Sequence, residues 1–208
     1  MDKAVSWNWA EQMVTEDEVT GRARERGEEL GSHPLSPATG AALRMLSASL
    51  GARAVLEIGT GTGVSGLWLL AGMPADGVLT TIESEAEYAQ AARTAFREAK
   101  LTGGRTRVIN DRALDVLPRM ATGAYDLVVC DGDPAETTAY LAQARRVLRP
   151  GGAIAVVHAL LADQVSDPAR RDPETVAMRQ AIIELYSDEN LLVTTLTCGD
   201  GLAVVNPL

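Results

Sequence analysis

The most informative stretch of the chain for binding chemistry is glycine-rich and spans residues 56–66, with the sequence LEIGTGTGVSG. It contains a literal G-x-G-x-x-G pattern, formed by Gly61, Gly63 and Gly66. This pattern is typical of loops that bind the pyrophosphate of a nicotinamide dinucleotide, because glycine lets the backbone approach the phosphates closely. Whether it applies here depends on where the glycines stand relative to the preceding strand.

The register of these glycines argues against a dinucleotide loop. The first glycine of such a loop follows its strand almost at once, yet the last apolar residue of the expected strand, Ile58, is followed by Gly59 and not by Gly61. Counted from Gly59, the stretch has an acidic residue, Glu57, at the strand end and then glycine at every second position. A carboxylate there suits a ligand with positive charge and is poorly placed beside a pyrophosphate.

A second acidic residue, Glu83, ends the next apolar run, VLTTIE. A carboxylate at the end of a second strand can accept hydrogen bonds from both hydroxyls of a ribose, so it fits several adenosine-containing ligands. Ser65 lies just inside the expected helix after the glycine loop, where its hydroxyl and the helix dipole favour a ligand carboxylate. A solvated acid and an ordinary first-turn serine are the plainer interpretations of these two residues.

The elements that must position these residues alternate between strands and helices. Short β-branched runs bounded by Gly, Pro or Asp predict strands buried on both faces, at residues 54–59, 78–83, 106–110, 125–131 and 152–160. Apolar residues at three- and four-residue spacing predict helices at residues 64–72, 85–101, 112–121, 135–148 and 174–187. Pro150 and Gly151 are expected to stop the fourth of these helices. The alternation predicts a parallel sheet with right-handed crossovers and helices on both faces.

The end of the chain departs from this alternation. Two strand-like runs, LLVTTLTCG and LAVVNPL, are separated by little more than Asp200 and Gly201, so no crossover helix fits between them. The last strand is therefore expected to run antiparallel. The sequence predicts an α/β fold of Rossmann-like type, with a seven-stranded, mostly parallel sheet that ends in an antiparallel β-hairpin.

The composition limits the classes of function. The chain has 208 residues, 46% of them hydrophobic, which suffices for one sizeable core. A formal net charge of -9, with dispersed basic residues, argues against a nucleic-acid partner. Neither an export signal nor a membrane-spanning run is recognisable, so a cytoplasmic protein without a membrane partner is expected. Cys130 and Cys198 lack C-x-x-C spacing and are expected to be buried free thiols.

A family resemblance rests on four segments of the chain: VLEIGTGTGVSGLWLL, TTIESEAEYAQAARTAFREA, DLVVCDGDP and RRVLRPGGAIAVVH. They resemble O-methyltransferase family 3, the group of small enzymes that includes the catechol and caffeoyl-CoA O-methyltransferases, and most of all its actinobacterial members. The resemblance covers roughly residues 30–208. It implies a class I methyltransferase that uses S-adenosyl-L-methionine (SAM) as its methyl donor.

The resemblance also implies which residues bind SAM. In the family the glycine loop approaches the amino-acid part of SAM, the acid after the second strand binds the ribose, and residues after the third strand hold the adenine. The cofactor-binding residues implied here are Glu57, Gly59, Thr60, Gly61, Gly63, Ser65, Glu83, Arg112, Ala113 and Asp131. Asp111 belongs to the adenine segment or is only the N-cap of the next helix. A β-branched residue at Gly61 should abolish SAM binding, whereas alanine at Gly66 should be mild.

The chain departs from the family pattern at the reacting centre. Metal-dependent members use an aspartate after the fourth strand and an Asp-Asn pair after the fifth to bind a divalent cation that polarises the acceptor hydroxyl. Asp131 matches the first ligand, but the pair falls on Val157 and His158, and valine has no ligand atom. The catalytic lysine of the catechol-type enzymes falls on Pro134. We therefore expect a reaction without a divalent metal.

Asp131, Asp133 and His158 remain as the catalytic candidates, at the carboxyl ends of adjacent strands. An unperturbed histidine has a pKa of ~6.5, which suits a general base near neutral pH. His158 could thus deprotonate an acceptor hydroxyl while Asp131 or Asp133 orients it. Alternatively the histidine only lines the pocket or bonds a loop carbonyl, or the three residues form a weak site for manganese, iron or zinc.

The chain is expected to consist of an N-terminal appendage and one domain. Residues 1–30 are expected to form a helical appendage, and residues 31–208 the methyltransferase domain. We expect the protein to form a homodimer. Trp7 and Trp9 could anchor the appendage either on the core or on the second subunit of this dimer. Trp68 is expected to pack in the core.

Two further segments are candidates for the acceptor side. By resemblance, His33, Ser36 and Thr39 would lie near the acceptor, but Ser36 followed by proline is more typical of a helix N-cap. Residues 162–173 are polar and broken by proline, as in a lid over the acceptor or a plain surface loop. Arg170 and Arg171 in this segment could bind an anionic acceptor.

The sequence as a whole predicts a SAM-dependent O-methyltransferase that acts on the hydroxyl of a small molecule. The transfer would be a single in-line displacement, for which the enzyme supplies proximity, orientation and exclusion of water. Two alternatives stay open: a SAM-binding homologue that has lost transfer activity, and an NAD-dependent oxidoreductase, which only the out-of-register glycine pattern favours.

Overall fold

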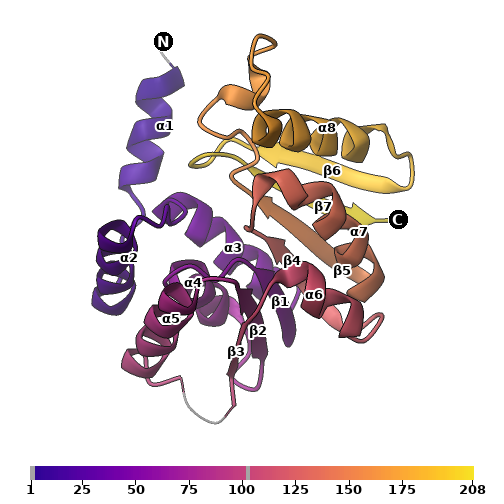
Figure 1. The fold of residues 1–208 in the computed structure, drawn as a ribbon. Coiled ribbons are helices and arrows are strands. Elements are labelled where there is room, and N and C mark those ends of the chain that lie inside the picture. Colours follow the sequence, from indigo (N-terminus) through magenta and orange to yellow (C-terminus); the bar gives the residue numbers. More distant parts are fainter. Residues whose placement is uncertain (1–2, 102–103) are drawn as a thin grey trace.

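The computed structural model describes residues 3–101 and 104–208, and so leaves out residues 1–2 of the expected appendage and residues 102–103 of the expected domain. A seven-stranded sheet lies between layers of helices (Figure 1). Its strands are β1 (Ala54–Ile58), β2 (Val78–Glu83), β3 (Thr106–Asn110), β4 (Tyr125–Cys130), β5 (Leu148–Val157), β6 (Leu191–Leu196) and β7 (Leu202–Pro207). Their order across the sheet is β3-β2-β1-β4-β5-β7-β6.

The sheet confirms the predicted Rossmann-like architecture. β1 to β5 pair in parallel, whereas β7 runs antiparallel to β5 on one side and to β6 on the other. The hairpin loop is longer than predicted, because β6 ends at Leu196 and not near residue 199. Gly199 and Gly201 in this loop have φ angles of 52° and 84°, a left-handed conformation that glycine adopts without strain. The loop folds back toward the end of β5, where the backbone N–H groups of Ala159 and Leu160 donate to the carbonyl oxygens of Gly201 and Asp200.

The helices cover both faces of the sheet, as predicted. They are α1 (Lys3–Gln12), α2 (Glu18–Leu30), α3 (Pro37–Ser49), α4 (Val64–Gly72), α5 (Ala86–Glu98), α6 (Ala113–Val116), α7 (Thr137–Val147) and α8 (Pro173–Ser187), with 3-10 turns η1 (Leu117–Arg119), η2 (Pro134–Glu136) and η3 (Gln164–Ser166). Helices α2 to α5 lie on one face, and α6 to α8 on the other (Figure 1).

Two helix predictions need correction. The helix expected at residues 112–121 is only the short α6 followed by the 3-10 turn η1, which begins at Leu117, because Pro118 lacks the N–H that a continued α-helix needs. The helix expected at residues 135–148 ends at Val147, and β5 begins at Leu148, before Pro150 and Gly151. A proline disfavours helical backbone at the residue before it, here Arg149, so the helix cannot continue to Pro150, and the strand expected at residues 152–160 is instead β5, Leu148–Val157.

The core consists of two apolar clusters, one on each face of the sheet. Successive strand residues alternate between them, as the two-residue period of a strand requires. Val55 and Leu127 pack with α3, α4 and α5, while Leu56 and Val128 pack with α7 and α8, and all four side chains are fully buried. The predicted burial of the central strands on both faces is thus confirmed.

The N-terminal helices attach to the domain through α2. The hydroxyl of Thr62 donates to the carbonyl oxygen of Ala23 at 2.7 Å, and the Trp68 indole donates to Glu16 at 3.2 Å. Trp68 is 8% exposed, which confirms its predicted packing in the core. By contrast, Trp7 and Trp9 on α1 are 49% and 64% exposed. The boundary near residue 30 stays a prediction.

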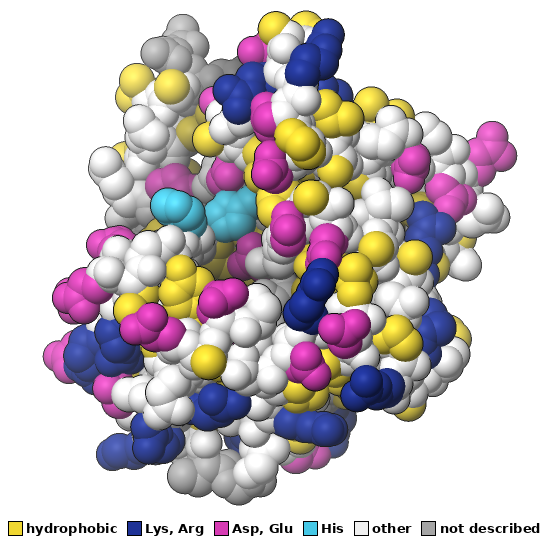
Figure 2. All heavy atoms as spheres, viewed as in Figure 1, with side chains coloured by type: hydrophobic (Ala, Val, Ile, Leu, Met, Phe, Trp, Pro, Cys, Tyr) yellow, Lys and Arg dark blue, Asp and Glu magenta, His cyan; other side chains and the backbone are white. Residues whose placement is uncertain are grey.

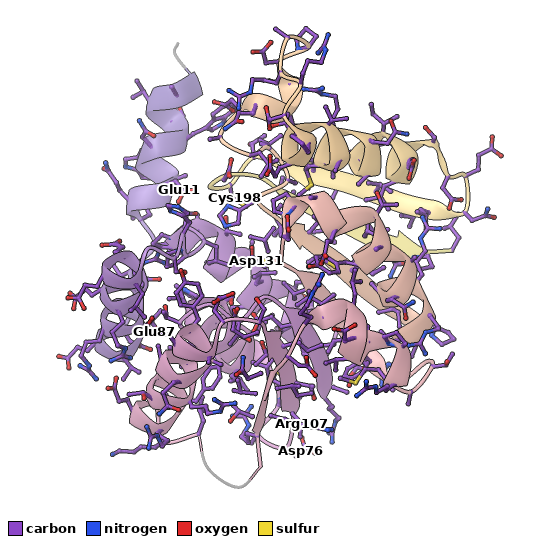
Figure 3. All side chains as sticks on the ribbon, viewed as in Figure 1. Glu11, Asp76, Glu87, Arg107, Asp131 and Cys198 are labelled. Atoms are coloured by element: carbon purple, nitrogen blue, oxygen red, sulfur yellow. The ribbon has the colours of Figure 1, made fainter. Side chains whose placement is uncertain are left out.

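Both cysteines are free thiols, as predicted. Cys130 is buried at the end of β4, as predicted, but the predicted burial of Cys198 is wrong, because this residue is half-buried in the hairpin loop. Figure 3 shows Cys198 close to Glu11 of α1, whose carboxylate accepts from the backbone N–H of Gly199. Among the described residues we find no helix with the length and apolar character needed to cross a membrane.

Candidate active site

A cavity of about 950 Å³ opens at the carboxyl ends of the parallel strands. Its walls come from the glycine loop after β1 and from the residues that follow β2, β4 and β5. The strand order reverses between β1 and β4, so the cavity lies at the topological switch point where α/β proteins bind their ligands. Figure 2 shows the hollow with both histidines at its edge and acidic side chains around it.

The glycine loop needs its glycines for two different reasons. Gly59, Gly61 and Gly63 all have positive φ angles, of 88°, 51° and 95°. A Cβ at Gly59 would overlap the backbone carbonyl of Asp131, and one at Gly63 would lie 3.2 Å from Cα of Ala92. At Gly61 the space is open, with only the Ser32 hydroxyl near at 3.4 Å. Gly61 therefore leaves room on the cavity side of the loop.

Gly66 is tightly packed, contrary to the sequence-based expectation. A Cβ there would lie 2.8 Å from Cζ of Phe96 and 3.0 Å from Cδ2 of Leu79. Phe96 is only 2% exposed and cannot simply move aside. The close approach of α4 to α5 and β2 thus requires glycine at this position, and the expected mildness of Gly66→Ala does not fit the structure.

Glu57 is a carboxylic acid buried at the end of β1. Its side chain has no exposed surface; Oε2 accepts a 2.6 Å hydrogen bond from the Thr81 hydroxyl, and Oε1 has no partner among the described residues. Burial raises the pKa of Glu57 to about 7, helped by the nearby Glu83 charge and opposed by the hydroxyls of Thr81 and Ser65. An unpartnered, buried carboxylate oxygen favours a cationic ligand.

Glu83 organises the glycine loop. Its Oε2 atom accepts from the backbone N–H of Gly61 at 2.8 Å and of Thr60 at 3.1 Å, and Oε1 accepts from Glu85 at 3.0 Å. The side chain is 7% exposed and lines the cavity. Since a carboxylate offers about four lone-pair sites, capacity remains for the hydroxyls of a ribose. The loop contact could not be predicted from the sequence, which places these residues more than twenty positions apart.

Asp131 follows β4 and lies at the centre of the molecule (Figure 3). Burial raises the pKa of this carboxyl well above its usual range, and the charges of Glu57 and Glu83 raise it further. The charges of these three acids therefore influence one another, and of the three Glu83 and Asp131 line the cavity, whereas Glu57 does not. Such a cluster is stabilised by a ligand that carries positive charge.

The residues predicted to hold the adenine ring lie together on the wall of the cavity. Arg112 and Ala113 both line the cavity, and the guanidinium of Arg112 pairs with Glu136 at 2.9 Å. Ser65 also lines it and is 4% exposed. The N-cap residue of α6 is Arg112, while the Asp111 carboxylate accepts from the Arg112 N–H. The alternative interpretation of Asp111 as the N-cap is therefore wrong.

His158 follows β5 with a strained backbone and two acidic neighbours. Its φ angle is 53°, a left-handed conformation that non-glycine residues rarely adopt. Nε2 lies 3.7 Å from Oδ1 of Asp131, and Nδ1 lies 3.1 Å from Oδ2 of Asp200. Asp200 is a site candidate that the sequence does not reveal, because Asp200-Gly201 is only a turn signal in the sequence.

Asp133 forms a capping contact, and its catalytic role stays a prediction. Its exposed carboxylate accepts from the backbone N–H of Ala135 at 2.9 Å and so caps η2. The side chain lines the cavity, but the acid beside Nε2 of His158 is Asp131. Of the two acids proposed to orient the histidine, the structure brings only Asp131 close to the ring.

The donor set around His158 fits a hard divalent cation poorly. Val157, where metal-dependent members have an aspartate, is 2% exposed and packs in the core. In the described part of the chain, no three His, Cys, Asp or Glu side chains form a group that could hold a metal ion. An imidazole with one carboxylate beside each of its two nitrogens does not supply the near-octahedral oxygen coordination that magnesium requires.

The segment after β5 closes one side of the cavity. Gln164, Arg170 and Asp172 line it. Arg170 pairs with Asp172 at 2.9 Å and donates to Gln164 at 2.5 Å, so its charge is already compensated. Arg171 donates to carbonyl oxygens and is not among the cavity-lining residues. The idea that these arginines receive an anionic acceptor is therefore not supported.

The N-terminal side of the cavity is formed by residues 31–35. His33 lines it and is exposed. Ser36 accepts from the Thr39 N–H at 3.2 Å, which confirms its predicted role as the N-cap of α3. Thr39 is buried and donates to the carbonyl oxygen of Cys198, so neither of these hydroxyl residues faces an acceptor.

The fold and the cavity define a Rossmann-like nucleotide-binding protein of the methyltransferase type, in which a glycine loop and strand-end acids surround the switch point. The chain belongs to the O-methyltransferase family, whose model matches residues 12–208. A Mycobacteroides abscessus protein that bears the provisional name O-methyltransferase is 45% identical over 193 residues, which is 93% of this chain and 90% of that protein.

Solved structures agree with this assignment. The O-methyltransferase TomG from Streptomyces achromogenes, in complex with SAM and involved in tomaymycin synthesis, is 27% identical with a TM-score of 0.85, covering 100% of this chain and 99% of TomG. An O-methyltransferase from Bacillus cereus in complex with S-adenosylhomocysteine (SAH) is 26% identical with a TM-score of 0.87, covering 98% of this chain and 99% of that one.

Proposed function

We propose that this protein transfers the methyl group of SAM to a hydroxyl group of a small molecule. The observation that carries this proposal is the cluster of Glu57, Glu83 and Asp131 next to the glycine loop, in which one buried oxygen of Glu57 has no partner among the residues that the structure describes. When bound, SAM supplies an electrophilic methyl group on a positively charged sulfur. The raised pKa of Glu57 and of Asp131 supports a site that is completed by a cation.

The chain's own residues fit the parts of SAM. Gly61 leaves open space against the loop, Glu83 has free lone pairs for the ribose hydroxyls, and Ser65 lies at the N-terminal end of α4 where a ligand carboxylate is favoured. Arg112 and Ala113 form the wall proposed for the adenine. Gly59, Thr60 and Gly63 hold the shape of the loop.

His158 is proposed as the general base. His158 lines the cavity and its Nε2 atom lies on the side of Asp131, so we propose that Nε2 accepts the proton of an acceptor hydroxyl while the Asp131 carboxylate stabilises the resulting imidazolium. The donor set fits magnesium poorly, and we propose a reaction without a divalent metal. The remaining contribution of the enzyme is orientation and exclusion of water.

The acceptor is proposed to be neutral or cationic. The described residues that line the cavity include many carboxylates, namely Glu83, Glu85, Asp131, Asp133, Glu136, Asp172, Glu174 and Asp200. The arginines that line the cavity in the described part of the chain are Arg112 and Arg170, and each forms an ion pair with an acid at 2.9 Å. An anionic acceptor would therefore meet repulsion without an available cation.

Location and assembly complete the proposal. We place the enzyme in the cytoplasm and expect a homodimer in which a second subunit covers Trp7 and Trp9, since large exposed aromatic side chains are typical of interfaces. Light scattering coupled to size-exclusion chromatography measures the mass in solution. A monomer at micromolar concentration contradicts the dimer, and loss of the dimer in Trp9→Ala supports the proposed face.

Calorimetric titrations with SAH and with NAD test the cofactor assignment. Binding of SAH without binding of NAD is expected, and the reverse result contradicts a methyltransferase. An acceptor library with radiolabelled SAM then tests transfer, with Gly61→Val as a control that should not bind the donor. SAH binding without transfer to any hydroxyl in the library would favour the alternative of a homologue that has lost activity.

A further inference from the structure

We infer that Asp200 is the positioning residue of His158, holding the ring so that Nδ1 carries the proton and the lone pair of Nε2 faces the cavity. The inference builds on the proposed role of His158 as general base. Asp200 lies on the hairpin loop, which is far along the sequence from the glycine loop and from β4. Three observations lead to it.

The first observation is the hydrogen bond itself. Nδ1 of His158 lies 3.1 Å from Oδ2 of Asp200, within hydrogen-bond distance. A carboxylate is an acceptor only, so a neutral imidazole at this distance must donate from Nδ1. In neutral imidazole the other nitrogen, Nε2, then has a free lone pair. That lone pair is what a general base requires.

The second observation is that Asp200 is itself held in place. Its Oδ1 atom accepts from the backbone N–H of Ala162 at 2.5 Å, and its carbonyl oxygen accepts from Leu160 at 3.0 Å. Next to it, the carbonyl oxygen of Gly201 accepts from Ala159 at 3.1 Å. The hairpin loop is thus tied to the strained segment after β5, and this tie fixes the direction in which the His158 ring points.

The third observation is the contrast with the other acid. Oδ1 of Asp131 lies 3.7 Å from Nε2, which is beyond hydrogen-bond distance. Asp131 therefore acts on His158 through its charge and does not select the protonated nitrogen. The two acids flank the ring on opposite nitrogens, and only Asp200 can determine the tautomer.

Asp200→Asn is the informative variant because of the contact with Ala162. The amide oxygen can accept from the Ala162 N–H only if its NH₂ group faces Nδ1, and the ring must then accept at Nδ1 and carry its proton on Nε2. Asp200→Glu keeps a carboxylate and should retain the native tautomer. Asp163→Asn, in the segment after β5 that contacts Asp200, is a matched control, since Asp163 does not line the cavity.

The test combines nitrogen NMR with kinetics. The chain has two histidines, so His33→Gln assigns the imidazole signals of His158. At about pH 8.5, above the ordinary histidine pKa of ~6.5, the wild type and Asp200→Glu should show a protonated Nδ1, and Asp200→Asn a protonated Nε2. In Asp200→Asn, kcat should fall by about 10²-fold while the KM for SAM and the Kd for SAH change by less than about 2-fold.

The outcomes distinguish the role of Asp200 from the proposed methyltransferase function. A protonated Nε2 in the wild type, or an unchanged tautomer and kcat in Asp200→Asn, overturns the role of Asp200 even if methyl transfer is found. The expected tautomers without transfer to any acceptor leave the role of Asp200 supported and count against the proposed function. If Asp200→Asn does not fold, the wild-type spectrum and the retained tautomer of Asp200→Glu decide.

Discussion

The hydroxyl of Thr81 donates a 2.6 Å hydrogen bond to one oxygen of Glu57, whereas the other oxygen of that carboxylate is buried without a partner among the described residues. The folded protein thus keeps an acid half-satisfied in its interior. Removing such a group from water costs free energy when it ionises, unless a ligand compensates the charge. This relationship leads to predictions on stability and on binding.

Glu57→Gln should stabilise the ligand-free protein at neutral and higher pH. The pKa of Glu57 is raised from 4.5 to about 7 in the folded state, so the wild type loses stability as pH rises from 4.5 to 7. Above that range the loss is about 3 kcal/mol, which the uncharged glutamine avoids. Urea unfolding at about pH 5 and pH 8 measures the difference, and Glu87→Gln on the exposed face of α5 is the control. A gain that is independent of pH contradicts the argument.

SAM should bind more tightly as pH rises. The raised pKa of Glu57, about 7, means that the site is partly protonated near neutral pH, and a positively charged ligand must displace that proton. The Kd for SAM should therefore decrease from about pH 6 to pH 8, by at most about tenfold per pH unit for one proton. Calorimetry in buffers of different ionisation enthalpy should detect proton release. Tighter binding at the lower pH would refute the linkage.

Gly61→Val and Gly66→Ala should fail in different ways. Valine at Gly61 meets a φ of 51° and places its side chain on the open side of the loop, so SAH affinity should fall by more than about tenfold while the protein still folds. Alanine at Gly66 collides with Phe96, so the free energy of unfolding should drop by about 1–3 kcal/mol with SAH binding retained. Calorimetry and urea unfolding of both variants measure the two quantities. Equal loss of binding at both positions would revive the dinucleotide register.

Activity should survive exhaustive chelation. Val157 removes one ligand position of the metal-dependent family members, and His158 offers nitrogen in place of an amide oxygen. His158→Ala should lower kcat by about 10²–10⁴-fold and flatten the acid limb of the pH profile, because that limb reports protonation of the base. His33→Ala is the matched histidine control. Loss of activity with EDTA, restored by a divalent ion, would overturn the metal-independent mechanism.

Acceptors that carry an amine should be preferred over otherwise similar acceptors that carry a carboxylate. Both arginines on the cavity wall are already paired with acids. A matched pair of phenolic alcohols, one with an aminomethyl and one with a carboxymethyl group, should differ in kcat/KM by about tenfold or more, and the difference should shrink at high salt. Preference for the carboxylate would show that an arginine becomes available on binding.

The sequence by itself determined the sheet and most of one cavity wall. Alternating apolar runs specify buried parallel strands, and the carboxyl ends of such strands meet at one edge, so Glu57, Glu83 and Asp131 had to converge. The differences between the predicted and the observed elements are confined to the ends of single helices and strands. α6 gives way to a 3-10 turn that contains Pro118, and β5 begins at Leu148, two residues before Pro150.

Only the tertiary structure decided what surrounds these residues. The packing of Gly66 against Phe96 depends on how closely α4 approaches α5, which no local pattern specifies. Likewise, β7 inserts between β5 and β6, and this order brings Asp200 to His158 from 42 positions away. A turn signal identifies where a chain reverses but not which strand end it folds against. That choice is made by the pairing of whole strands, and it sets the partner of the proposed base.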